Sequence, residues 1–195
     1  MSAEVVEKIA AQAMTDAIEI RALIETVEAG NNKEITAAIN KAKAGRAADH
    51  VQRSLFTRMH LIVARHYFPP RDGDLHAKRA FELLKDGTIR DEVADIPELQ
   101  KELKIAEKLW EKCNKSELLE PFMHFRNKQL AHWAELDHEV PIPLYKEVFD
   151  FSRMTAAMLA QLMRATGIAM VSLESQIPAY TESAANFWKP WTQIK

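Results

Sequence analysis

The chain has 195 residues, of which 47% are hydrophobic and 28% are charged, and its formal net charge at pH 7 is −2. This composition is typical of one globular domain and excludes a disordered chain. The charge excludes a global basic field, so any contact with nucleic acid would depend on a local patch.

Cysteine usage and the apolar runs indicate the cellular compartment. Cys113 is the only cysteine, which excludes a disulfide framework and a zinc site built on cysteines. The first residues, MSAEVVEKIA, are acidic and carry no apolar signal segment. The longest apolar runs, such as AAMLAQLM, are too short to cross a bilayer. These features predict a cytoplasmic protein that does not span a membrane.

The first part of the chain has a helical pattern, because apolar residues recur every three or four positions. The spacing predicts a long first helix over residues 3–29, with Ser2 as its N-cap. A second helix is expected to begin near Asn32, with Gly45 as a kink or an interruption. Phe68 precedes two prolines, which disfavour the α conformation before them, so the second helix should end there.

The later part of the chain continues the helical pattern. Further helices are expected at residues 75–86, with Asp74 as N-cap, and from Pro97, near Pro121 and at Leu144. Gly167 should close the last helix, and residues 168–195 are expected to be an irregular tail. We therefore predict an all-α protein. It should be an up-and-down bundle of four to five main helices in a single domain, residues 1–195, with its core at about residues 45–167.

The stretch FRNKQLAHW, residues 125–133, places polar groups where helical spacing predicts a core. A buried unpaired guanidinium is costly. Arg126 therefore lies at a rim, has a carboxylate partner, or belongs to a site with His132. On an ideal α-helix these two residues are about 120° and about 9 Å apart, so one helix does not easily bring them together. A second copy of the helix, packed across a two-fold axis, would bring these groups around one cleft. If this is a site, we therefore expect it to be homodimeric.

Residues 126–132, RNKQLAH, resemble the R-x(4–6)-H motif of the HEPN superfamily. Residues 63–86, VARHYFPPRDGDLHAKRAFELLKD, resemble the upstream part of its abortive-infection U-type (AbiU-like) branch, in which a polar loop separates two helices. The likeness covers about residues 45–165. It implies a HEPN-like all-α endoribonuclease that acts as a homodimer and needs neither a metal nor a cofactor.

The resemblance also implies roles for the motif residues. His132 would be the general acid/base, since the ordinary histidine pKa of about 6.5 suits proton transfer at neutral pH. It would help the ribose 2′-hydroxyl attack the adjacent phosphate, which leaves a 2′,3′-cyclic phosphate. Arg126 would stabilise charge on the phosphate, and Asn127 would orient the substrate or the histidine. Three further residues are candidate substrate contacts: Arg65, Lys128 and His124. A surface ion pair for Arg65 and simple packing for His124 are the alternatives.

A metal centre is the weakest interpretation. Carboxylate-bridged di-iron bundles need two Glu-x-x-His motifs, and the pair Glu135 and His138 supplies one. We therefore predict a cytoplasmic HEPN ribonuclease of phage defence or of a toxin–antitoxin-like system. Its substrate would be RNA, and an antitoxin or regulatory protein would be its partner. The alternative is a non-catalytic HEPN-like helical module that binds a partner protein or a nucleotide through the same cleft.

Overall fold

The computed structural model describes residues 2–131, 139–168 and 172–193. Every regular element in these ranges is a helix, which confirms the predicted all-α class. The long helices of these ranges are α1 (Ser2–Gly30), α3 (Gly45–Arg65), α6 (Pro97–Asn114), α8 (Tyr145–Ala165) and α9 (Leu173–Thr192). The short elements are α2 (Lys33–Lys41), α4 (Ala77–Leu83), α5 (Gly87–Val93), α7 (Leu119–Phe125) and the π-helix η1 (Arg126–Ala131).

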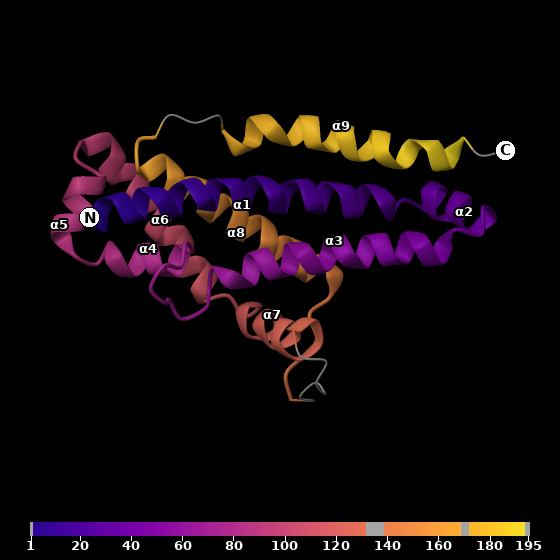
Figure 1. Ribbon diagram of the computed structural model, residues 1–195, viewed down its shortest axis with the longest axis horizontal. Coiled ribbons are helices and arrows are strands. Elements are labelled where there is room, and N and C mark those ends of the chain that lie inside the picture. The colour runs from indigo at the N-terminus through magenta and orange to yellow at the C-terminus, as the bar shows by residue number, and fades with distance from the viewer. Residues whose placement is uncertain (1, 132–138, 169–171, 194–195) are drawn as a thin grey trace.

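Helix α1 is the centre of the bundle. It packs against α3, α8 and α9, and α6 in turn packs against α8. Figure 1 shows α9 running along one side of α1 and α3 along the other, with α7 beyond α3. Alanines at positions 10, 13 and 17 of α1 are fully buried and allow close approach, while Ile20 and Ile24 fill the space between helices. Burial of each such isoleucine contributes about 1.5–3 kcal/mol to folding.

The connection between α3 and α4 differs from its prediction. Helix α3 ends at Arg65, as the following prolines require, but α4 begins at Ala77 with His76 as its N-cap. The prediction of Asp74 as N-cap is therefore wrong. Asp74 instead accepts a hydrogen bond from the backbone N–H of Arg71, at 2.7 Å, which closes the loop on itself. Farther upstream, Gly45 starts α3 and separates it from α2, so it acts as an interruption.

The prediction of an irregular tail over residues 168–195 is wrong, because α9 occupies most of it. Ser172 caps this helix by accepting from the N–H of Ser175 at 3.2 Å. Trp188 is buried and donates its indole N–H to the carbonyl oxygen of Thr26 at 2.8 Å. At Gly30 a Cβ atom would lie 2.6 Å from the Trp188 ring, so the glycine permits this close approach. The single-domain boundary stays a prediction.

In the parts of the chain that the structure describes, no helix has the length and apolar content that a membrane span requires.

Candidate functional site

The predicted motif begins where the α-helix α7 becomes a π-helix. Helix α7 ends at Phe125, and η1 runs from Arg126 to Ala131. π-helical turns are rare and occur frequently at functional sites. The separation of about 120° between Arg126 and His132 assumed an ideal α-helix, so it does not apply to this segment. His132 lies outside the described residues, and its position relative to Arg126 stays a prediction.

Arg126 is half-buried and is held by an aromatic ring and an amide. Its guanidinium lies over the ring of Phe68, with Cζ 4.5 Å from the ring centroid, which is a cation–π contact. Its Nη1 donates to Oδ1 of Asn127 at 2.9 Å. Its buried Nε has no hydrogen-bond partner among the described residues. Among the described residues, the cation is thus positioned by neutral groups, an aromatic ring and an amide oxygen.

Helix α3 contacts α7 through His60, which lies more than one turn before Arg65. The ring of His60 stacks on Phe122, with the ring centroids 3.6 Å apart, and its Nε2 donates to the Phe122 carbonyl oxygen at 2.8 Å. Burial lowers the pKa of His60 to about 4, so the ring is neutral near pH 7. This contact fixes the chain one turn before Arg126.

Arg65 at the end of α3 is anchored to a buried carboxylate. Its guanidinium forms an ion pair with Asp16 of α1, and its Nε donates to Oδ2 at 3.1 Å. Gln12 donates to the same carboxylate at 2.9 Å, and Nε2 of His66 lies 3.0 Å from it. Burial alone would raise the pKa of Asp16, but the contacts with His66 and Arg65 outweigh it and lower that pKa. Asp16 therefore stays charged at neutral pH.

His66 links this anchor to the α3–α4 connection. Its Nδ1 accepts a hydrogen bond from the backbone N–H of Ala77 at 3.1 Å, so its Nε2 carries the proton and faces Asp16. Burial lowers the pKa of His66 more than the neighbouring carboxylate raises it. The neutral ring thus joins the start of α4 to α1 and fixes both ends of the connection.

Arg65 and Arg126 line one pocket of about 370 Å³. The rest of its lining comes from the α3–α4 connection: Phe68, Pro69, Arg71, Asp74 and His76. The structure thus brings two predicted site residues together. Arg65 is ion-paired, but to a buried carboxylate and not at the surface, and its role as a substrate contact stays a prediction. The sequence places Arg71 in a basic segment that could follow an RNA backbone, but the nearby aspartates favour an ordinary solvated face for it, and His76 is not predicted as a site residue. The sequence did offer an indication, because Arg71 and His76 lie in residues 63–86, the segment that resembles the upstream part of the family.

The other predicted residues lie close to this pocket in the chain but do not form its lining. Asn127 contacts Arg126 as described, and Lys128 and His124 are half-buried on η1 and α7. The structure does not bring Lys128 or His124 into the pocket, so their roles as substrate contacts stay predictions. Among the described residues, no three His, Cys, Asp or Glu side chains come together as a metal site would require.

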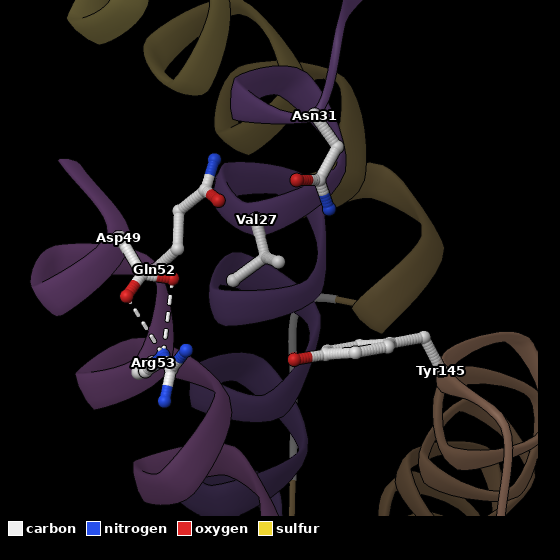
Figure 2. A pocket seen from close by; sticks show the side chains of 6 residues that line it. All are labelled: Val27, Asn31, Asp49, Gln52, Arg53 and Tyr145. Carbon is white, nitrogen blue, oxygen red and sulfur yellow. Dashed lines mark hydrogen bonds and ion pairs between the residues drawn. The ribbon is translucent and has the colours of Figure 1, made fainter. Parts of the chain in front are cut away.

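A second pocket, of about 340 Å³, lies between α1, α3 and α8. Figure 2 shows Arg53 bonded to Asp49 on α3, with Tyr145 pointing across from the start of α8. Asn31, Gln52 and Val27 complete its lining, and none of the predicted site residues is among them. Arg53 lies twelve residues before Arg65 in α3, about 18 Å along the helix, so the two pockets are separate.

Comparison with known proteins identifies one family. The family model for AbiU2, a HEPN family, matches residues 3–179 of the chain. The match therefore includes α1 and the first part of α9, and it extends beyond the segment of about residues 45–165 in which the motifs were found. No curated protein and no solved structure matches the chain.

Proposed function

This chain belongs to the AbiU2 family of HEPN proteins, and on that premise we propose that it is a metal-independent endoribonuclease of phage defence or a toxin–antitoxin-like system. One observation carries the proposal. Arg126, the arginine of the R-x5-H motif, is held over Phe68 in a pocket that also contains Arg65, and its Nε has no hydrogen-bond partner among the described residues. A guanidinium fixed in this way is suited to a phosphate on which negative charge develops.

The proposed reaction follows from the chemistry of RNA. The ribose 2′-hydroxyl gives its proton to the neutral imidazole of His132, and its oxygen forms a bond to the adjacent phosphorus. Arg126 donates to the phosphoryl oxygens as the pentacoordinate arrangement forms. The bond to the 5′-oxygen of the next nucleotide then breaks, and a protonated imidazole returns a proton to that oxygen. The products are a 2′,3′-cyclic phosphate and a 5′-hydroxyl.

We propose that a homodimer carries out this reaction, with the motif residues of both protomers around one cleft. A dimer supplies two imidazoles, so one His132 can accept a proton while the partner's His132 donates one. The segment that leads into α8 carries large apolar side chains that are more than half exposed: Ile142, Leu144 and Tyr145. Such an exposed apolar group, which follows the motif in the chain, supports an interface on this part of the molecule.

The test is cleavage of total cellular RNA and tRNA by the purified protein in EDTA. Wild type, His132→Ala and His50→Ala are compared, because His50 is an exposed histidine of α3 outside both pockets. We expect wild type and His50→Ala to produce cyclic-phosphate ends and His132→Ala to produce none. Equal cleavage by wild type and His132→Ala would contradict the assignment of His132. No cleavage by wild type would favour the non-catalytic module that binds a partner protein or a nucleotide.

A further inference from the structure

We propose that the pocket between the α3–α4 connection and η1 binds a phosphate group of the RNA strand, with Arg71 and His76 as contacts in addition to Arg65 and Arg126. The inference rests on the proposed ribonuclease function for the identity of the strand. It goes beyond that function by adding two residues from outside the motif and a phosphate subsite contained in one protomer.

The charges around the pocket favour an anion. Three arginines line it, Arg65, Arg71 and Arg126, against two aspartates, Asp74 in the lining and Asp16 paired with Arg65. Asp16 is 1% exposed and is occupied by Arg65, His66 and Gln12, so it does not face a ligand. The described part of the chain gives Arg126 no carboxylate partner. The pocket therefore keeps a net positive charge, which is what a phosphate group requires.

His76 is the second observation that points to a ligand. It is 6% exposed and lines the pocket, yet neither of its ring nitrogens makes a hydrogen bond among the described residues. Its Nε2 lies 3.4 Å from Oδ2 of Asp74, a contact without hydrogen-bond geometry. A buried polar group without a hydrogen-bond partner destabilises the folded protein. A phosphate oxygen that accepts from the ring N–H would remove this cost.

The shape of the pocket suits a phosphate attached to a sugar. Its volume of about 370 Å³ falls within the range of roughly 300–1,000 Å³ that is usual for small-ligand sites. Phe68 and Pro69 form an apolar wall beside the arginines, against which a ribose ring can pack. The pocket at Arg53 lacks this combination, since its one guanidinium is paired with Asp49.

The experiment measures binding without cleavage. Inorganic phosphate, uridine 3′-monophosphate and a 2′-O-methyl RNA oligonucleotide, which has no attacking hydroxyl, are titrated into the full chain by calorimetry. Wild type, Arg71→Ala, His76→Gln and the control Arg53→Ala are compared, with circular dichroism as a check of folding. Arg71 is exposed, so Arg71→Ala keeps the test valid if His76→Gln fails to fold. The same variants are then assayed for cleavage of tRNA.

We expect the modified RNA to bind wild type and Arg53→Ala equally and to bind Arg71→Ala and His76→Gln at least tenfold more weakly, as loss of one charged hydrogen bond predicts. Unchanged affinity in Arg71→Ala and in folded His76→Gln would overturn the inference, even if wild type cleaves RNA. Binding that depends on these residues without cleavage would contradict the proposed ribonuclease alone. If inorganic phosphate or the mononucleotide binds as tightly as the RNA, the source is a free phosphoryl compound, and the assignment to the RNA strand is overturned.

Discussion

Helix α3 carries two arginine–aspartate pairs beside two pockets, and the two pairs differ in what they fix. Arg53 pairs with Asp49 one turn earlier in the same helix, at 2.9 Å, and the side chains are 73% and 54% exposed. Arg65 pairs with Asp16 of another helix, a side chain that is 1% exposed. A pair within one helix turn does not constrain other helices. A pair that crosses to a buried carboxylate fixes the end of α3 against α1, and with it the place of the Arg65 guanidinium.

Replacing each of the two aspartates with asparagine should give the largest difference in the free energy of unfolding. Asp16→Asn should lower the free energy of unfolding by about 1–3 kcal/mol, because the buried groups around the carboxylate lose a charged acceptor, while Arg65 still reaches water. Asp49→Asn should lower it by less than about 0.5 kcal/mol, since exposed pairs contribute little. Urea unfolding followed by circular dichroism measures both. Equal losses would show that burial does not distinguish the two pairs.

Acid should weaken the Arg65 side of α3 through its buried histidines. Burial lowers the pKa of His60 from 6.5 to about 4, so the unfolded chain binds a proton that the folded chain excludes between these values. Stability from this group is therefore complete above pH 6.5 and is lost as the pH falls toward 4. Between about pH 7 and about pH 4.5 the loss due to His60 is about 2.5 kcal/mol.

The contribution of His60 to the loss of stability in acid is measured by comparing variants. This is necessary because the lowered pKa values of His66 and His76 act in the same direction. Urea unfolding at the two pH values should show a smaller loss in His60→Gln than in wild type. The exposed control His50→Gln should keep the wild-type loss. The account of His60 fails if His60→Gln and wild type lose the same stability on acidification.

Substitutions of Asn127 test the role of Arg126, which lines the same pocket as Arg65. Its Oδ1 accepts from Nη1 of Arg126, so it is a positioning residue in the proposed reaction. Asn127→Ala should slow cleavage roughly tenfold, the effect of losing about 1.4 kcal/mol of orientation, without changing the free energy of unfolding much. Asn127→Asp keeps the acceptor but adds a negative charge beside the phosphate, so it should raise KM more than it lowers kcat. An identical response of both variants in KM and kcat would remove the positioning role.

The sequence predicted the helices well because their apolar residues repeat at the helical period. Helix α9 was missed because Pro178 and Pro190, which usually interrupt helices, lie inside it. The π-helix was missed because its short run of residues has no distinct apolar spacing. Asp16 was predictable in part, since it falls three residues after Ala13 and four before Ile20, which are buried.

Only the motif residues of the candidate site could be predicted from the sequence. RNKQLAH located Arg126 and Asn127, but the pocket depends on the packing of α3 and its following loop against η1. Nothing in the local spacing of Arg71 or His76 indicates that they lie beside Arg126. Their juxtaposition is a property of the tertiary structure, since the loop is closed by Asp74 and anchored through His66 to α1.

The most direct test of the central claim is single-turnover cleavage of tRNA in EDTA by Arg126→Ala and Arg53→Ala beside wild type. The two variants lose the same side chain from pockets of similar size, and neither arginine is among the buried core residues. We predict that Arg53→Ala cleaves at the wild-type rate and that Arg126→Ala is slower by about 100-fold or more. Cleavage by Arg126→Ala at the wild-type rate would contradict the account.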